Sequence, residues 1–178
     1  MLSVIISAQS FANNSNPENE KKNTEIVKKT DKTIVSVAAS NSNFTTLVAA
    51  VKAAGLVDVL NSKGPFTVFA PVNDAFGKLP KGTVATLLKP ENKKLLTAIL
   101  TYHVVAGKFK AADVVKAIKS NGGKFVISTV QGGKLTASIK NGKVILTDVK
   151  GNVSTIVLTD VAASNGIVHA IDTVVMPQ

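Results

Sequence analysis

The side chains best suited to acid–base or metal chemistry in this sequence are its two histidines, His103 and His169. Each stands among aliphatic neighbours, in the runs YHVV and IVHAI. A zinc site needs three or four nitrogen, sulfur or oxygen ligands, usually at close spacing, and neither histidine has such neighbours. The pattern therefore predicts buried neutral imidazoles that bond to backbone or carboxylate groups, and no metal site.

Carboxylates and hydroxyls are the remaining candidates for catalysis. Asp74 and Asp172 each lie beside a predicted strand end, where an aspartate ordinarily caps a helix or accepts backbone hydrogen bonds. The G-x-S-x-G turn of serine hydrolases is absent, and the chain has no cysteine. The glycine pairs at 122–123 and 132–133 lie between strands, which indicates turns and not a phosphate-binding loop. The sequence predicts no catalytic residue and no cofactor.

Lysine alone supplies the positive charge of this chain. There are 21 cationic side chains, all lysine, and 11 acidic ones, which leaves a formal charge of +10. Arginine reads phosphates and guanine edges with a rigid fork, whereas lysine is a hydrated point charge, so nucleic-acid recognition is disfavoured. Attraction to anionic lipid or polysaccharide fits better. The basic middle of the chain is either a solvated face or an anion-binding patch, with Lys93, Lys94, Lys108, Lys110, Lys116, Lys119 and Lys124.

The N-terminal part differs from the rest in composition. Residues 1–12 form a signal-peptide-like segment, in which the apolar stretch Leu2–Ile6 precedes the small residues of Ser10–Ala12; the alternative is a plain apolar N-terminus. Residues 13–32 are polar and charged and predict a flexible linker. Residues 33–178 are predicted to fold as one domain. Because no stretch reaches about 18 uncharged apolar residues, no membrane-spanning helix is expected.

The first part of the folded region has the spacing of helices. Apolar residues recur at i, i+3 and i+4 over residues 34–38. The same spacing returns over residues 47–54, where Asn43 is the predicted N-cap and Gly55 ends the helix.

A buried strand is predicted next, from the run FTVFA at residues 66–70. Asn73 or Asp74 is expected to cap the short helix that follows. Pro90 then opens a longer helix, in which we expect one face to be shared by Leu95, Ile99 and Tyr102 or His103.

The last third of the chain has the period of strands. Residues 125–130 and 135–139 alternate apolar and polar side chains, and Asn141-Gly142 is a favoured two-residue hairpin turn. Segments 154–158 and 167–175 complete a run of at least five strands. Helices followed by a meander of strands predict an α+β fold rather than a parallel βαβ array.

Three strings of residues together resemble the fasciclin (FAS1) family of extracellular adhesion domains. They are GPFTVFAPVNDAF at residues 64–76, YHVV at residues 102–105 and NGIVHAID at residues 165–172. With IVSVAA at residues 34–39 and VVMP at residues 174–177, their order and spacing extend the resemblance over nearly the whole folded part.

The resemblance implies a wedge-shaped β-sandwich flanked by a layer of short helices. The first string would lie on a strand and the helix after it, and the third on the last strand. Family members mostly mediate attachment without catalysis, and some bind carotenoid-like pigments. In adhesion-type relatives the regions that match Asn73-Asp74 and Tyr102-His103 are tied to partner binding. These four residues, with His169 of the third string, are the candidate binding or motif residues.

Two functional hypotheses follow. The first is a non-enzymatic interaction module, secreted, periplasmic or on the cell surface, that binds an extracellular protein or polysaccharide and associates weakly with itself to gain avidity. The alternative is a carrier that holds a lipid or carotenoid-like pigment in an apolar cleft between helices and sheet. Neither involves nucleic acid or a transmembrane span. A hydrolase or metalloenzyme is disfavoured because no polar residues converge.

Overall fold

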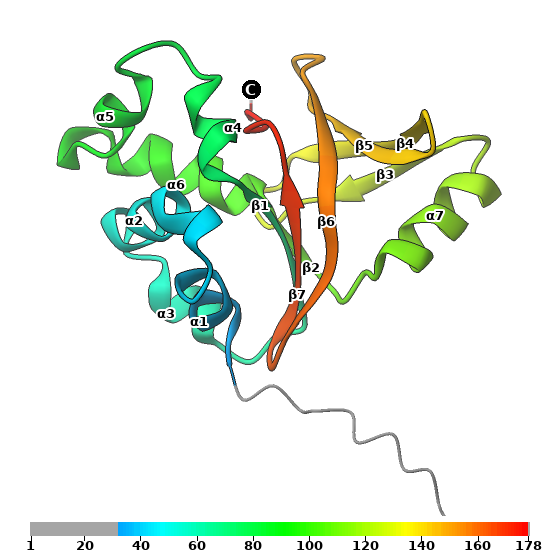
Figure 1. Cartoon of the computed structure of the whole chain (residues 1–178), viewed down its shortest axis with the longest axis horizontal. Coiled ribbons are helices and arrows are strands. Elements are labelled where there is room, and N and C mark those ends of the chain that lie inside the picture. Colours follow the sequence, from blue (N-terminus) through cyan, green and yellow to red (C-terminus); the bar gives the residue numbers. More distant parts are fainter. Residues whose placement is uncertain (1–31, 178) are drawn as a thin grey trace, which may run out of the picture.

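The computed structural model describes residues 32–177. The signal-like segment predicted for residues 1–12 and all but the last residue of the linker predicted for residues 13–32 therefore lie outside the described residues. Short helices make up most of the first part of the chain (Figure 1). They are α1 (Ile34–Ala39), η1 (Ser42–Phe44), α2 (Thr45–Ala54), α3 (Val57–Asn61), α4 (Asn73–Gly77), α5 (Thr83–Leu87), η2 (Pro90–Asn92), α6 (Lys93–Tyr102) and α7 (Ala111–Ser120). None of these helices is both long and apolar enough to cross a membrane.

Seven strands form one sheet in the order β2-β1-β7-β6-β5-β4-β3. Their bounds are β1 (Phe66–Pro71), β2 (Val104–Ala106), β3 (Lys124–Ser128), β4 (Lys134–Lys140), β5 (Lys143–Thr147), β6 (Val153–Ala163) and β7 (Gly166–Ile171). The long strand β6 pairs with β5 near its start and with β7 farther along, which lets the sheet fold over at β6. The Val130 N–H donates to the Val104 carbonyl at 2.8 Å, so the far end of the sheet returns to β2.

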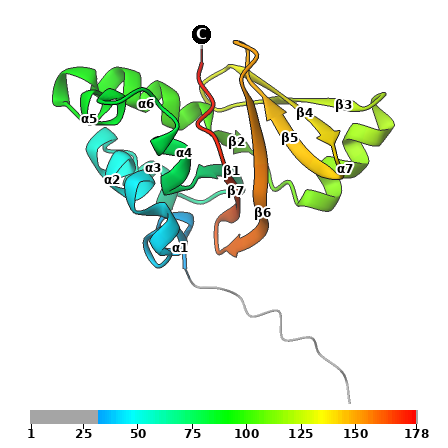
Figure 2. The ribbon, with the colours of Figure 1, turned by 45° about the horizontal axis from the view of Figure 1, so that its top comes forward.

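The helices divide between the two sides of the central strands. Figures 1 and 2 show α1 to α6 together on one side of β1 and β7, and α7 on the other side beside β3 and β4. Side chains of β1 therefore point alternately into two cores: Val68 and Ala70 pack with α1 to α6, and Phe69 packs with α7 and the folded-over strands. Burial on both faces accounts for the continuous apolar run in β1.

The structure confirms the predicted α+β class, with the sandwich formed by one folded sheet. It also corrects the predicted face of α6. Leu95, expected to be buried, is 51% exposed. The buried face instead runs through Leu96, Ile99, Leu100 and His103. The sequence did not predict β2, because three residues after a helix carry too little alternation to indicate a strand.

Candidate functional site

The three strings that resemble the fasciclin family lie side by side in the sheet, at the β2-β1-β7 end of the strand order. The first and third form β1 and β7, which pair in parallel from Phe66↔Gly166 to Pro71↔Ile171. The second continues into β2, which pairs antiparallel with β1 at Thr67↔Val105. Residues about 100 positions apart in sequence are therefore neighbours. The main role of the strings is thus structural, because they form the frame of the fold.

Glycine is required where these two strands begin. A Cβ on Gly64 would lie 1.9 Å from the carbonyl oxygen of Asn165, and one on Gly166 would lie 2.1 Å from that of Phe66. Both contacts are with backbone, which cannot rotate away as a side chain can. The two chain segments approach this closely only because neither glycine has a side chain.

His103 is buried, 2% exposed, at the end of α6. Its Nδ1 lies 2.8 Å from the Ile99 carbonyl oxygen, and its Nε2 accepts from the Val175 N–H at 3.3 Å, so the ring is neutral with its proton on Nδ1. Burial lowers the pKa of His103 to about 4, although the Ile99 carbonyl and the Asp148 carboxylate act in the opposite direction. The imidazole joins α6 to the C-terminal segment.

His169, on β7, is also buried, with 1% of its surface exposed. Its Nδ1 accepts from the Asp160 N–H at 3.2 Å, and its Nε2 lies 2.8 Å from the Phe109 carbonyl oxygen. The ring stacks on Phe69 with centroids 5.8 Å apart. Both nitrogens of both histidines are thus engaged by backbone groups, which leaves no imidazole lone pair for a metal ion or a substrate proton.

Tyr102 is fully buried, and its hydroxyl donates to the Lys134 carbonyl at 2.6 Å. A Cβ on Gly133 would lie 2.4 Å from the tyrosine ring, so that glycine gives the ring its space. Burial raises the pKa of the Tyr102 phenol, as does the nearby Asp148 carboxylate, while a bond from the Val149 backbone acts against them. Tyr102 therefore holds β4 against α6.

Asn73 lies at a corner between two helices and differs from its predicted role. Its Oδ1 accepts from the Thr46 N–H at 3.1 Å, and its Nδ2 donates to the Ser42 carbonyl at 2.8 Å. Asn73 therefore caps α2, whereas α4 begins after Val72 without a side-chain cap. The prediction that Asn43 caps α2 was wrong, since that residue lies within η1. A cap supplied from a distant segment leaves no local signal in sequence.

Asp74 is the one candidate among the five whose side chain is exposed. It lies in the first turn of α4, directly after the corner that Asn73 holds. The structure thus separates the candidates into four buried or partly buried residues that stabilise the fold and one that faces solvent.

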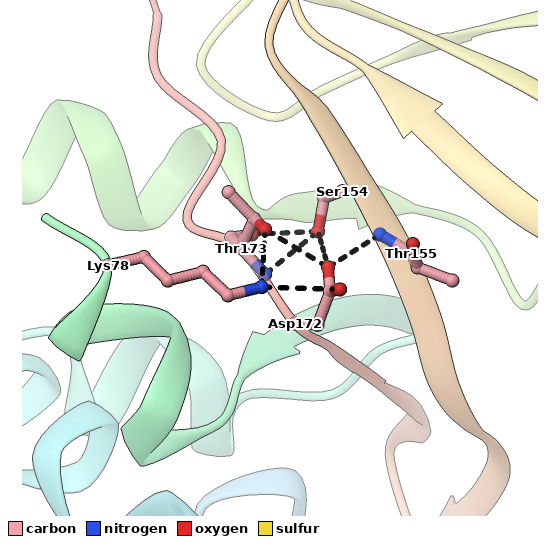
Figure 3. Close-up of polar contacts among 5 residues, drawn as sticks. All are labelled: Lys78, Ser154, Thr155, Asp172 and Thr173. Carbon is pink, nitrogen blue, oxygen red and sulfur yellow. Dashed lines mark hydrogen bonds and ion pairs between the residues drawn. The ribbon is translucent and has the colours of Figure 1, made fainter.

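Asp172, at the end of β7, is the centre of a polar cluster (Figure 3). Its carboxylate accepts from the Thr155 N–H at 2.7 Å and the Thr173 hydroxyl at 3.0 Å, and it pairs with the Lys78 ammonium at 3.3 Å. Partial burial by itself would raise the pKa of Asp172, but these partners outweigh it and lower the pKa. The cluster joins β6, β7 and the end of α4, so Asp172 accepts backbone bonds as predicted.

Two residues with large structural roles had no recognised role in the sequence. Asn165 donates to the Leu60 and Ser62 carbonyls at 2.7 and 3.0 Å and accepts from the Ile34 N–H at 3.0 Å. Asp148, 5% exposed, accepts from three backbone N–H groups and one amide side chain: Lys150 N, Asn152 N, Met176 N and Asn152 Nδ2. Asn165 was marked in the sequence only as the first residue of the third family string, which gave it no role.

The size and lining of the surface pockets limit which ligands the described residues can enclose. Within residues 32–177, two pockets lined mainly by apolar side chains, beside Leu47 and beside Phe66, each have a volume of about 20 Å³. The larger openings, of about 480 and 630 Å³, are lined mainly by polar and charged residues. Sites for drug-sized ligands usually enclose about 300 to 1,000 Å³. Within residues 32–177, no three His, Asp or Glu side chains are placed to hold a metal ion.

The sheet, its covering helices and the three central strings define a rigid α+β scaffold. The Fasciclin domain model matches residues 42–177, and the chain belongs to the fasciclin domain family. Protein sll1483 of Synechocystis sp. is 54% identical over 145 residues, which are 82% of this chain and 73% of that protein. Immunogenic protein MPB70 of Mycobacterium bovis is 44% identical over 149 residues, covering 80% of this chain and 68% of the relative.

A solved structure shows the same fold. The FAS1 domain pair of the insect cell adhesion molecule Fasciclin I superposes with a TM-score of 0.72 and covers 81% of this chain and 50% of that chain, at 19% sequence identity. The family is thus one known for adhesion-related extracellular proteins.

Proposed function

We propose that this chain is a non-enzymatic interaction module that works outside the cytoplasm, secreted, periplasmic or at a cell surface, and binds an extracellular protein or polysaccharide. One observation carries the proposal. The family strings contain three side chains of types that enzymes use in catalysis: His103, His169 and Asp172. All three are engaged in hydrogen bonds within the protein. They hold a scaffold together, and recognition falls to the exposed surface.

The surface available for recognition is rich in unpaired lysines. Residues 32–177 contain one ion pair, between Lys78 and Asp172. Uncompensated positive charge attracts anionic surfaces over distances of about 10 Å at moderate salt. Family membership, with its adhesion-related members, and the signal-like residues 1–12 support an extracellular setting for this attraction.

Bead attachment tests the proposal. The full chain, fixed to beads by its C-terminus, is expected to retain them on cells or extracellular matrix more strongly as its surface density rises, because weak sites gain avidity together. The control beads carry a basic protein of unrelated fold and equal net charge. Equal retention of both kinds of bead would contradict a dedicated interaction module.

The alternative carrier function is tested separately. The apolar pockets described above are small, which disfavours it. Native mass spectrometry and an absorbance spectrum of protein purified gently from its own source would reveal a bound lipid or pigment. We expect the bare polypeptide mass, and a stoichiometric hydrophobic ligand would replace the adhesion proposal with the carrier hypothesis.

A further inference from the structure

A polar depression opens at the end of the sheet where β1 and β7 begin. Its volume is about 480 Å³, and Gly64, Pro65, Asn165 and Gly166 are among the residues that line it. The first and third family strings thus start at this depression, so the paired strands β1 and β7 position it. We call it the lysine depression, for Lys63 and Lys108, which also line it.

The two lysines give the depression its charge. Both are exposed, and neither makes a hydrogen bond or ion pair with any residue in the described part of the chain. Within residues 32–177, no aspartate or glutamate lines it. Two ammonium groups at one depression without a counter-charge attract an anion, and a bound anion would reduce the repulsion between them.

The segment that carries Lys108 is fixed against the start of β1. The Gly107 N–H donates to the Pro65 carbonyl at 2.9 Å, and the Thr67 hydroxyl donates to the Gly107 carbonyl at 2.7 Å. On the other side of Lys108, the Phe109 N–H donates to the Thr67 hydroxyl at 2.9 Å. The backbone on both sides of the lysine is therefore held in place, which lowers the entropy lost when its ammonium binds a ligand.

The opposite wall is fixed as well. Asn165 ties together the end of α3, the loop that precedes Lys63 and the start of α1, through its bonds to Leu60, Ser62 and Ile34. The backbone of Gly64 makes no hydrogen bond within the described residues, so its N–H has no protein partner there. One neutral donor, the Gly64 N–H, thus accompanies the two ammonium groups on a framework that is already in place.

We propose that the lysine depression binds the anionic groups, sulfate or carboxylate, of an extracellular polysaccharide. This inference rests on the proposed function and names the partner of the module. Lysine ammonium groups suit separate single charges along a chain better than the two-point recognition of one phosphate, for which arginine is preferred. The depression is open to solvent along the surface, so a polymer can lie across it without its ends entering a cavity.

Binding of the full chain to dextran sulfate, with neutral dextran as the blank, tests the proposal. In a Lys63→Gln/Lys108→Gln double variant, we expect the dissociation constant to rise at least about tenfold, because two charge-assisted contacts are lost. The matched control is Lys116→Gln/Lys119→Gln on α7, which removes the same charge elsewhere on the surface. It is expected to weaken binding less than about threefold. Thermal melting verifies that both variants fold.

Three results would overturn the inference. Equal weakening in both double variants would mean that attraction is spread over the whole basic surface. Inorganic sulfate that competes as well as dextran sulfate, per anionic group, would make the depression a site for free anions. A folded chain that ignores dextran sulfate yet retains beads on cells would refute this partner while the interaction module stands; loss of bead retention as well would refute both.

Discussion

The central strands and the lysine depression use their polar groups in opposite ways. His103, which directly precedes β2, and His169, on β7, have a partner for every ring nitrogen. At the lysine depression, a short distance along the same strands, Lys63 and Lys108 have none in the described chain. The difference supports our proposal, in which the family strings specify a rigid frame and residues around its ends bind the partner.

The largest effect on stability is expected from one methyl group added where β7 begins. Gly166→Ala places a Cβ 2.1 Å from the Phe66 carbonyl oxygen, and we expect the free energy of unfolding to fall by more than about 3 kcal/mol. Gly77→Ala is the matched control, because no atom lies within 4 Å of its Cβ and alanine favours the helix it lies in. Urea denaturation measures both, and equal stabilities would show that the two strands are not fixed at this approach.

Acid should weaken the frame through His103. Its pKa falls from 6.5 in the unfolded chain to about 4 in the fold, so the unfolded chain binds a proton that the native chain excludes. Stability is therefore full above about pH 6.5 and declines as the pH drops toward 4, by about 2 to 3 kcal/mol. The lowered pKa of Asp172 adds a loss in the same direction at still lower pH.

Denaturation midpoints across this pH range measure the effect. His103→Gln keeps a donor and an acceptor but does not titrate, so its stability should depend much less on pH between these values. A variant that keeps the full acid sensitivity would assign the effect to another group.

The neighbouring residues Asn73 and Asp74 allow a structural role and an exposed surface position to be compared directly. Asn73→Ala removes the cap of α2 and the bond to Ser42, and should cost about 1 to 2 kcal/mol of stability. Asp74→Ala should change stability by less than about 0.5 kcal/mol, since its side chain is exposed. Thermal melts of the two variants provide the comparison, and a larger loss for Asp74→Ala would reverse the assignment.

A smaller loss than that of Asn73→Ala is expected at Tyr102. Tyr102→Phe removes one hydroxyl that donates to the Lys134 carbonyl and leaves the ring in place, so the loss should be about 1 kcal/mol. Urea denaturation at neutral pH measures it. A loss several times larger would mean that the hydroxyl holds more of the sheet than this one bond.

Local signals explain what could be predicted from the sequence. The run FTVFA became β1, and Asn141 and Gly142, with φ of 51° and 74°, form the predicted turn between β4 and β5. Features that depend on distant residues could not be predicted in this way. The cap of α2 by Asn73 spans 27 residues, and the clamp from Asn165 to Ile34 spans 131. The lysine depression is of the same kind, because its lining comes from segments far apart in the chain.

Bead retention by two folded variants distinguishes frame from recognition surface most directly. We expect beads that carry Tyr102→Phe to attach to cells or matrix as strongly as the unaltered chain, because Tyr102 is fully buried. Beads that carry Lys63→Gln/Lys108→Gln should lose most of their attachment. Loss of attachment in folded Tyr102→Phe, with full attachment by the lysine variant, would contradict the division between a buried frame and an exposed recognition surface.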